Sequence, residues 1–355
     1  MVLAPRFLFR TSTFKRFHSY LTAMNPNEES TKSELAATEQ AKGDKAKREE
    51  ADESTKPNKR KKNNVLFPSS RATEGNTSLI TKAMNEAFGP LELDKESTVA
   101  EVGKKVHTRN HVNPLSAKWN APIAAPEWSS VFKNPSLPLF IDIGCAAGRF
   151  GLAAAASENW KEFNHLGLEI RELHVNRANA WAAAKKYENL HYITCSANTS
   201  LKGFLETYPG TISWVAVQFP DPHFKKKHHK RRVVTPDILD ILGKFMPEES
   251  VLFLQSDVEE TSSQMRDRTA ASKYFSRHGD YSDADPLLDP EVNCSGNEAL
   301  WTGDGKRALE GHSDYGGWLT GPNPVGIPTE REVQNNALGL PIYRATFKRN
   351  SQAFE

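Results

Sequence analysis

The sequence predicts an α/β fold with a doubly wound sheet, and three observations support this fold class. Short apolar runs typical of strands alternate with helical segments through the middle of the chain. The first run, LPLFIDIG, passes through a glycine-rich turn straight into an alanine-rich helix. The segment TPDILDILGKF places Thr235 at an N-cap and Pro236 at the first helical position, which is a strong helix-start signal. Strands and helices that alternate at this spacing form sheets with right-handed crossovers.

Taken in order, the expected strands are LFIDI (residues 139–143), FNHLGLEI (163–170), LHYITC, SWVAVQF, SVLFLQSD and LPIYRATFKR (340–349). The helices expected between them are the segment from Gly148 onward, RELHVNRANAWAAAKKY, SLKGFLETY and TPDILDILGKF. Residues 277–324 are rich in Asp, Gly, Asn and Pro and have no clear period, so we expect a long surface loop or insertion.

The chain of 355 residues predicts one core domain with appendages. Residues 1–24 carry Arg and Lys among Phe, Leu, Ser and Thr without an acid, which is typical of an organellar transit peptide. Residues 25–64 hold too few large apolar side chains to fold, so we expect a disordered charged linker. Residues 65–134 are expected to form an N-terminal extension, and residues 135–355 the α/β domain.

Composition limits the classes of function. The net charge is only +2, so binding of nucleic acid requires a local cluster of Lys and Arg. The three cysteines form no C-x-x-C pair and no zinc spacing, so we expect no disulfide scaffold and no metal site. The longest apolar stretches are short and broken by polar residues, so we expect a soluble protein that does not cross a membrane.

The turn DIGCAAG after the first strand is the candidate cofactor site, because ligands of doubly wound sheets bind where strand order reverses. Gly144 and Gly148 allow a ligand and a helix to approach closely, and Ala146 stands where a middle glycine is usual. Glu169 ends the second strand, where an acid binds a ribose diol. The pattern fits NAD and S-adenosylmethionine, and a turn that serves only the fold is the alternative. Asp142 favours S-adenosylmethionine, because an acid there repels a pyrophosphate and attracts a sulfonium or ammonium group.

The fourth strand ends in FPDP, which brings Asp221 to the same edge of the sheet. The two flanking prolines stiffen the segment and remove competing backbone donors. The run HFKKKHHKRR that follows contains no acid. A rigidly placed acid beside a basic strip suggests an active site for a polyanion, in which the cluster holds phosphates and Asp221 addresses one base. A capping aspartate beside a solvated charge run is the alternative.

On these residues the chain resembles the tRNA (guanine-N7)-methyltransferases, class I S-adenosylmethionine-dependent enzymes with a seven-stranded Rossmann-like fold. The matching motifs are RNHVNPL, DIGCAAGRF, LGLEIRELHVNRAN, FPDPHFKKKHHKRRVV, QSDV, NPVGIPTERE and PIYR. The longer match GWLTGPNPVGIPTERE is similar to the plant organellar branch of the family.

The resemblance implies three sets of site residues. With Asp142 and Gly148, the cofactor set would comprise Gly144, Glu169, Ile170, Arg171, Ser196, Ala197 and Gln218. The family usually has Asp or Asn where Ser196 stands, so the adenine contact departs from its pattern. The guanosine side would comprise Asp221, Lys225, Asp257, Thr329, Glu330 and Glu332. The tRNA backbone would contact Lys226, Lys227, Lys230, Arg231 and Arg232.

Asp221 is the expected catalytic residue. Guanine N7 presents a free lone pair, so methyl transfer needs alignment and electrostatic placement and no prior deprotonation. Asp221 would orient the guanine through its donor edge and favour the positive charge that develops on the ring. The implied target is the variable-loop guanosine of tRNA, which must leave the tRNA tertiary fold to reach the pocket.

The resemblance implies tRNA as the partner and a monomer or homodimer, and it leaves an accessory subunit open. It places the protein in the chloroplast or the mitochondrion, with the chloroplast favoured, and the patch KPNKRKK makes the nucleus the alternative. Three rival functions are an exocyclic-amine methyltransferase of RNA or DNA, a nicotinamide-dependent oxidoreductase and a non-catalytic tRNA-binding protein. The missing third glycine disfavours the oxidoreductase, and the intact set of Asp142, Gly144, Glu169, Asp221 and Thr329-Glu330 disfavours the binding protein.

Overall fold

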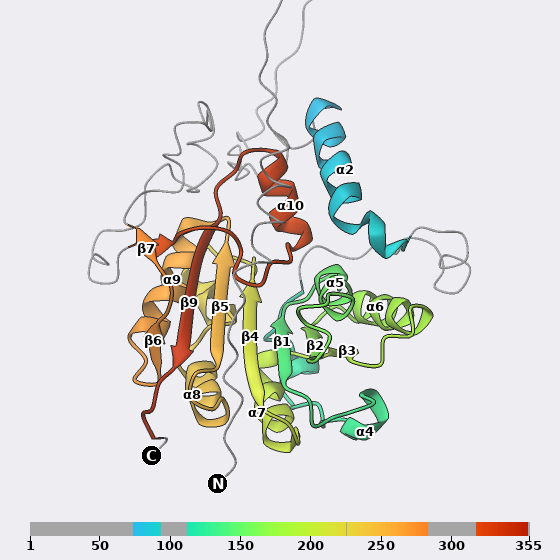
Figure 1. The fold of residues 1–355 in the computed structure, drawn as a ribbon. Coiled ribbons are helices and arrows are strands. Elements are labelled where there is room, and N and C mark those ends of the chain that lie inside the picture. The colour runs from blue at the N-terminus through green and yellow to red at the C-terminus, as the bar shows by residue number, and fades with distance from the viewer. Residues whose placement is uncertain (1–73, 94–111, 225, 283–316, 354–355) are drawn as a thin grey trace, which may run out of the picture. The chain divides into compact units, whose positions relative to one another are not determined.

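The computed structural model describes residues 74–93, 112–224, 226–282 and 317–353 (Figure 1). The predicted transit peptide, the predicted linker and the start of the RNHVNPL motif therefore lie outside the described residues. So do Lys225 and most of the predicted loop at 277–324.

The core is a seven-stranded sheet with the order β3-β2-β1-β4-β5-β9-β6. Its strands are β1 (Leu139–Ile143), β2 (Asn164–Glu169), β3 (Leu190–Thr194), β4 (Ile212–Gln218), β5 (Val251–Ser256), β6 (Phe275–Arg277) and β9 (Tyr343–Arg349). The five strands from β1 to β5 pair in parallel, and β9 is antiparallel to both β5 and β6. This confirms the predicted doubly wound Rossmann-like sheet, whose strand order reverses between β1 and β4.

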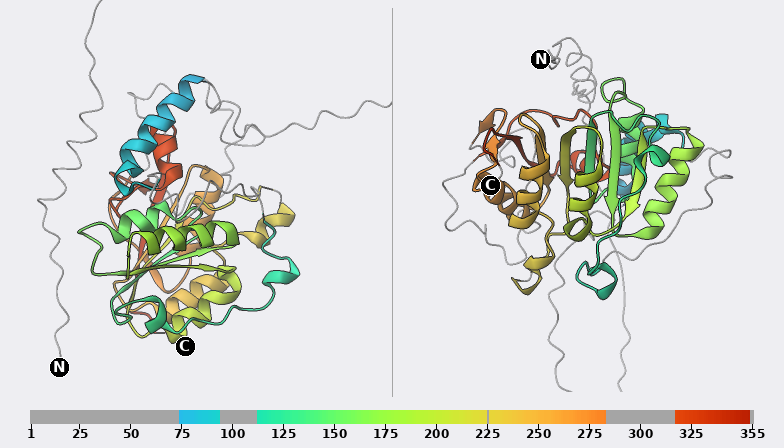
Figure 2. Two further views of the ribbon diagram at one scale, coloured as in Figure 1. Left: turned by 90° about the vertical axis from the view of Figure 1, so that its right-hand side faces the viewer. Right: turned by 90° about the horizontal axis from the view of Figure 1, so that it is seen from below.

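Helices cover both faces of the sheet, as the views in Figure 2 show. They are α5 (Arg149–Ala155), α6 (Glu172–Ala184), α7 (Ala197–Thr207), α8 (Pro236–Phe245) and α9 (Glu259–Ala270). On one face, α7 and α8 bury Phe204 and Leu242 in the same apolar cluster as Ile141 of β1. On the other face, α5 packs Phe150 and Ala154 against Phe140 of the same strand. Alternate residues of β1 therefore serve opposite layers, as a strand buried on both sides requires.

The helix starts follow the predicted local chemistry. At α8, the Thr235 hydroxyl accepts a hydrogen bond from the amide of Ile238 at 3.3 Å, and Pro236 is the first helical residue. The late helix α10 (Glu330–Ala337) begins with a capping box in which Thr329 and Glu332 exchange side-chain and backbone hydrogen bonds. The TERE stretch therefore fixes the entry into α10.

The N-terminal extension supplies a helix that the sequence reading left unassigned. Helix α2 (Glu74–Phe88) continues into the 3-10 turn η2 (Gly89–Leu91) and lies beside α10 (Figure 1). Phe88 and Leu91 share an apolar cluster with Val333 of α10, so burial of these side chains anchors the extension. Further along the extension are the short helices η3 (Ala117–Trp119) and α4 (Trp128–Val131).

The two ends of the predicted loop at 277–324 carry strands that the sequence reading missed. Strand β6 ends at Arg277, and β7 (Tyr281–Ser282) pairs antiparallel with β8 (Trp318–Leu319). Trp318 holds this ribbon to the core, because its ring packs against Tyr343 with centroids 4.9 Å apart and the Arg266 guanidinium lies 4.3 Å from its centroid. In the part of the chain that the structure describes, no helix combines the length and apolar character needed to cross a membrane.

Two helical glycines give opposite predictions for stability. In α8, a Cβ added at Gly243 would lie 2.4 Å from Cδ2 of the buried Tyr274, whereas a Cβ at Gly203 in α7 meets nothing within 4 Å. We expect Gly243→Ala to lower the free energy of unfolding by about 1–3 kcal/mol through overpacking. Gly203→Ala should raise it by about 0.5–1 kcal/mol, because alanine is the better helix former. Urea denaturation of both variants tests this, and equal shifts would contradict the packing argument.

Candidate active site

The site lies at the carboxyl edge of the sheet, where the chain leaves β1 and β4 in opposite directions. The turn that begins at Gly144 follows β1, and the FPDP segment follows β4. Because β1 and β4 are paired neighbours, with Ile143 beside Val217, the two segments emerge side by side. Strand reversal thus brings together the two motifs that the sequence indicated.

The two glycines of the turn serve different purposes. Gly144 has φ +85°, and a Cβ built on it meets nothing within 4 Å, so its open side is available to a ligand. Gly148 has φ +79°, but a Cβ there would lie 2.7 Å from Cβ of Ala178 and 2.9 Å from Cζ of Tyr192. Gly148 therefore permits close packing of the α5 start against α6 and β3. Between them, Ala146 adopts φ +47°, a left-handed conformation that is strained for alanine.

Glu169 is fixed at the end of β2 by the backbone around it. Its Oε2 accepts a hydrogen bond from the Ala146 amide at 3.0 Å, and its Oε1 accepts one from the Arg171 amide at 2.9 Å. Burial raises the pKa of Glu169, while the Arg171 guanidinium, 3.5 Å from Oε1, opposes that shift. A carboxylate has about four acceptor sites, so this one can still accept from ligand hydroxyls.

Asp142 is buried beneath the turn, and its Oδ1 accepts a hydrogen bond from Nε2 of Gln218 at 3.2 Å. Burial raises the pKa of Asp142 from 3.8 to about 7; the Gln218 hydrogen bond opposes this, and the charge of Glu169 adds to it. A cation placed near Asp142 would relieve this penalty. The site therefore favours a cationic ligand group, as the sequence predicted from Asp142.

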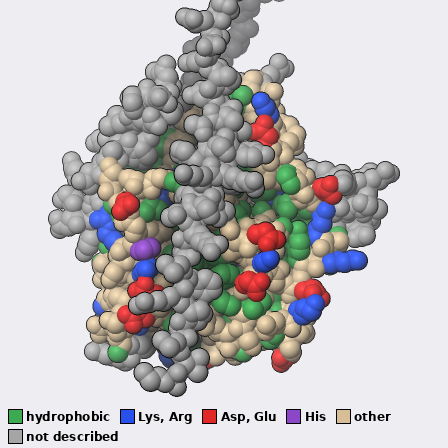
Figure 3. Space-filling model, in the orientation of Figure 1, with side chains coloured by type: hydrophobic (Ala, Val, Ile, Leu, Met, Phe, Trp, Pro, Cys, Tyr) green, Lys and Arg blue, Asp and Glu red, His purple; other side chains and the backbone are tan. Residues whose placement is uncertain are grey.

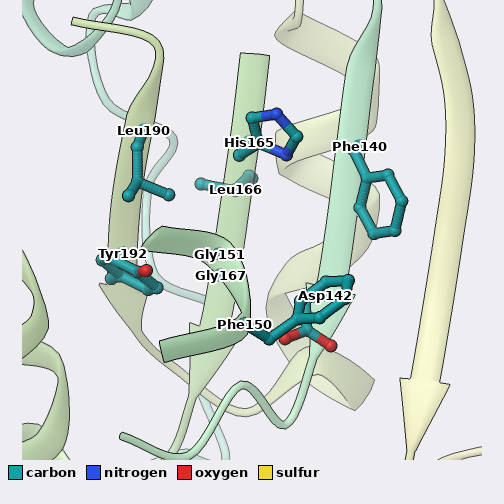
Figure 4. A pocket seen from close by; sticks show the side chains of 9 residues that line it. All are labelled: Phe140, Asp142, Phe150, Gly151, His165, Leu166, Gly167, Leu190 and Tyr192. Carbon is teal, nitrogen blue, oxygen red and sulfur yellow. The ribbon is translucent and has the colours of Figure 1, made fainter. Parts of the chain in front are cut away.

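Behind the turn is a small cavity between α5 and strands β1, β2 and β3 (Figure 4). It holds about 10 Å³, barely the room of one water molecule, and apolar side chains such as Phe140 and Leu166 line it. It also touches Asp142 and His165, and burial lowers the pKa of His165 to about 4. This cavity is a packing gap in the core and is far too small for a nucleoside.

The predicted adenine residues lie at the start of α7, on the same sheet edge. Ser196 is the N-cap residue of α7 and is buried, and its side chain makes no capping hydrogen bond. The neighbouring Cys195 amide donates to the Glu169 carbonyl at 3.0 Å, which ties this segment to the end of β2. Ile170 and Arg171 are half-buried directly after β2. The predicted cofactor residues thus form one continuous edge from β3 to β4.

The FPDP segment is held in a strained path. Phe219 has φ +50° and donates its amide to the Gln255 carbonyl at 2.8 Å, and His223 has φ +48°. Asp221, half-buried, lies between these residues. Burial lowers the pKa of His223, and the charge of Asp221 opposes that shift. Positive φ angles on both sides of the proline pair limit where the Asp221 carboxylate can lie.

The basic run beyond Asp221 divides into an outer and an inner part. It forms the 3-10 helix η4 (Lys226–Arg231), in which Lys230 is exposed and Arg231 half-buried. Arg232 is buried instead. Its Nε donates to the Pro222 carbonyl at 2.9 Å, its Nη2 donates to Oε1 of Glu260 at 2.7 Å, and its Nη1 donates to Gln264. The predicted role of Arg232 on the tRNA backbone therefore conflicts with its place in the fold, where it ties the FPDP turn to α9.

On the face seen in Figure 3, acidic and basic side chains are intermingled over the described surface. Exposed ion pairs such as Lys133 with Glu188, 2.6 Å apart, add little to stability. The run around η4 is the local concentration of positive charge that the sequence pointed to.

The predicted guanosine-side residues are paired with partners from other elements. Glu330, partly exposed, forms an ion pair with Arg149 at the start of α5. Asp257, after β5, accepts from Arg331 with Nε at 2.8 Å and Nη2 at 2.7 Å from Oδ2. These pairs join the start of α10 to both halves of the sheet edge. A nucleobase that bound one of these carboxylates would compete with the arginine paired to it.

Glu332 differs from its neighbours because it is buried, with only 3% of its surface exposed. Its Oε1 accepts from Nη2 of Arg344 at 2.7 Å, and its Oε2 accepts from Asn323 at 2.7 Å and from Gln255 at 3.2 Å. A direct contact of Glu332 with guanosine therefore conflicts with its burial. Sequence reasoning missed Gln255, Asn323 and Arg344 as site residues, although each lies in a motif of the family resemblance.

Comparison with known proteins places the chain in a family. A family model described as a putative methyltransferase matches residues 136–310. The chain is 40% identical to the tRNA (guanine-N(7)-)-methyltransferase of Nostoc sp. over 248 residues, which are 69% of this chain and 95% of that protein. It is 39% identical to the tRNA (guanine-N(7)-)-methyltransferase of Synechococcus elongatus over 246 residues, 69% of this chain and 97% of that protein. The crystal structure of TrmN from Thermus thermophilus covers 41% of this chain, and this chain covers 39% of it, with a TM-score of 0.30 and 14% identity.

The strand order and the glycine turn define the class of protein, a methyltransferase of the Rossmann-like type. Within that class, the chain belongs to the tRNA (guanine-N(7)-)-methyltransferase family, because its curated relatives match along nearly their whole length.

Arg232 and Lys230 provide a matched test of the two parts of the basic run. Replacing the buried Arg232 by Met removes its hydrogen bonds to Pro222, Glu260 and Gln264. Glu260 is partly exposed, so we expect a loss of only about 1–3 kcal/mol of unfolding free energy. Lys230→Met, at an exposed position, should change stability by no more than about 0.5 kcal/mol.

Limited trypsin digestion supplies a second readout at the lysines that both variants keep. Cleavage there should be faster in Arg232→Met than in Lys230→Met, because the turn has lost its tie to α9. Equal stability and equal cleavage in the two variants would show that Arg232 does not hold the turn.

Proposed function

We propose that the chain transfers a methyl group from S-adenosylmethionine to N7 of a guanosine in the variable loop of tRNA. The observation that carries this proposal is the position of Asp221. It lies in a rigid turn at the end of β4, beside the cofactor turn after β1 and directly before the basic run. The near-full-length similarity to proteins named tRNA (guanine-N(7)-)-methyltransferase supports the same reaction.

The residues on the carboxyl edge fit S-adenosylmethionine. When bound, this cofactor supplies an electrophilic methyl group on a positively charged sulfur. Buried Asp142, with its raised pKa, favours the positive charge of that ligand, and Gly144 leaves space for its approach. Glu169 holds acceptor oxygens at the end of β2, where a ribose diol donates. Ser196 and Ala197 supply the start of α7 for the adenine side.

Guanine N7, the methyl acceptor, needs little chemical activation by the protein. Guanine N7 has a lone pair that no proton blocks, so the chain does not need a general base to activate it. Asp221 accepts hydrogen bonds from the donor edge of guanine and stabilises the positive charge that the ring gains with the methyl group. The strained, proline-flanked turn fixes that carboxylate, so the alignment is set before the substrate arrives.

The basic run supplies the affinity for tRNA in this proposal. Lys230 and Arg231, together with Lys226 and Lys227, lie on or next to η4 and hold backbone phosphates without reading sequence. Arg232 contributes indirectly by holding the turn. Binding through this run should therefore weaken as salt concentration rises.

We propose the chloroplast as the location. The relatives from Nostoc and Synechococcus are cyanobacterial, and the composition of residues 1–24 is that of an organellar transit peptide. Import of the full chain into isolated chloroplasts, with shortening at the N-terminus, tests this location; import into mitochondria alone would contradict it.

Methyl transfer to defined transcripts tests the reaction. The full chain is incubated with labelled S-adenosylmethionine and two tRNA transcripts that differ only in guanosine or adenosine at the variable-loop target. We expect 7-methylguanosine in the digest of the guanosine transcript alone. Asp221→Ala should retain tRNA binding and lose roughly 100-fold or more in turnover, because it removes electrostatic placement at the reacting base.

Asp240→Ala is the matched control, since Asp240 is an exposed acid on α8. It should leave turnover and tRNA binding unchanged. Transfer to both transcripts would point to a different target base. Equal losses of binding and turnover in Asp221→Ala would remove Asp221 from its catalytic role.

The raised pKa of Asp142 predicts a pH dependence of cofactor binding. Its carboxyl titrates at about 7 in the ligand-free chain, and only the ionised form attracts a cation. Affinity for S-adenosylmethionine should therefore be highest above pH 7 and fall as pH decreases, by up to tenfold per pH unit well below 7. His165 stays neutral through this range, because burial lowers its pKa to about 4. Calorimetry between pH 5 and 7.5 measures the trend, and Asp142→Asn should bind weakly with no such slope.

A further inference from the structure

A row of polar side chains crosses the carboxyl edge of the sheet on three neighbouring strands. Gln218 of β4 is in register with Gln255 of β5, and Gln255 is in register with Arg344 of β9. Gln218 and Gln255 are both buried, and the exposed fraction of Gln255 is 0%. The four residues before each glutamine are apolar, WVAV in β4 and VLFL in β5, so these amides follow an apolar run.

These side chains connect the cofactor acid to the start of α10. Nε2 of Gln218 donates to Oδ1 of Asp142 at 3.2 Å, and Oε1 of Gln218 accepts from Nε2 of Gln255 at 2.8 Å. The same Nε2 of Gln255 donates to Oε2 of Glu332 at 3.2 Å. We name this path Asp142–Gln218–Gln255–Glu332 the amide chain.

At its far end, the amide chain fixes the first turn of α10. Oε2 of Glu332 also accepts from the Thr329 amide at 3.4 Å, which completes the capping box. Arg344 joins the two last members, since its Nε donates to Oε1 of Gln255 at 3.1 Å and its Nη2 to Oε1 of Glu332 at 2.7 Å. The position of Glu332 thus sets the position of the helix start that carries Glu330 and Arg331.

Both donors and the oxygen of the Gln255 amide are already hydrogen-bonded, so Gln255 cannot change one partner without losing another. Its amide has two N–H donors, which serve Gln218 and Glu332, and its oxygen accepts from Arg344. Burying such groups costs free energy unless every one is hydrogen-bonded, so a rotation that breaks one contact is opposed by the others. Because Gln255 contacts both Gln218 and Glu332, it joins the Asp142 end of the amide chain to the α10 end.

We propose that the amide chain couples the cofactor site to the acceptor side, so that a ligand engaging Asp142 sets the first turn of α10. Gln218 and Gln255 act as positioning residues in this coupling, and Asn323 and Arg344 hold Glu332 in register. That this turn contacts tRNA rests on the proposed function. The turn carries or adjoins Thr329, Glu330 and Arg331, and Arg331 pairs with Asp257.

Hydrogen exchange of α10 tests the coupling without tRNA and without turnover. S-adenosylhomocysteine, at saturation, is added to the full chain, and exchange of the α10 amides (Glu330–Ala337) is followed. We expect at least roughly fivefold slower exchange in the unsubstituted chain, in line with typical coupling between sites. Gln255→Met, which keeps the volume and removes the amide, should abolish that slowing.

Asn164→Leu is the matched control. Asn164 is a fully buried amide at the opposite end of β2, where it donates to Asn134 and Tyr208, so its loss should lower stability without changing the response of α10. Gln255→Asn, which retains a shorter amide, provides a second variant if Gln255→Met does not fold. It should weaken the slowing, because one methylene of reach is lost.

Affinity for tRNA with and without S-adenosylhomocysteine extends the test. The ligand should tighten binding by about 5-fold or more in the unsubstituted chain and leave it unchanged in Gln255→Met. An α10 that does not respond to the ligand, or that responds equally in Gln255→Met, would overturn the proposal. A chain that shows the α10 response yet yields no 7-methylguanosine would instead contradict the proposed function.

Discussion

The parallel pairing of β1 with β4 is the constraint on which the rest of the site depends. The chain leaves these two strands toward opposite sides of the sheet, so their carboxyl ends are not covered by a crossover of their own. That edge receives the Gly144 turn from one strand and Asp221 from the other. Two further elements hold these segments in place: Glu330, at the capped start of α10, pairs with Arg149 directly after Gly148, and the buried Arg232 donates to the Pro222 carbonyl next to Asp221.

Electrostatics at this edge follow from the same geometry. Asp142 lies one residue before the end of β1, and Glu169 ends the neighbouring parallel strand β2. Both are buried, and the charge of Glu169 adds to the raised pKa of Asp142. The protein offsets this cost with backbone amides at Glu169 and a side-chain amide at Asp142. The ligand-free site is therefore short of positive charge, and a cationic ligand completes it. The basic run lies beyond Asp221, after β4, so it is separated along the sheet edge from the two buried acids of β1 and β2.

Local patterns predicted six of the seven strands of the main sheet, the glycine turn and the Thr235 cap, because each depends on residues that are adjacent in the chain. The sequence could not show that Arg232 turns inward, since its partners Glu260 and Gln264 belong to a helix that follows much later. It likewise suggested Glu332 as a ligand contact, whereas burial and Arg344 commit that carboxylate to the core. Charge and motif indicate that a residue belongs to the site. The direction of its side chain is decided by the helices and strands that pack against it.

The short ribbon of β7 and β8 has a consequence for how this family can vary. Tyr281 pairs with Leu319 and Ser282 with Trp318, so residues separated by a long stretch of chain are held next to each other. Closing a longer loop costs only about 0.6 kcal/mol for each doubling of its length. With Trp318 anchored on Tyr343, segments of very different length can be inserted between these two strands in the course of evolution with little effect on the sheet. At the ribbon, the sheet can therefore accept inserted sequence at a small cost in chain entropy.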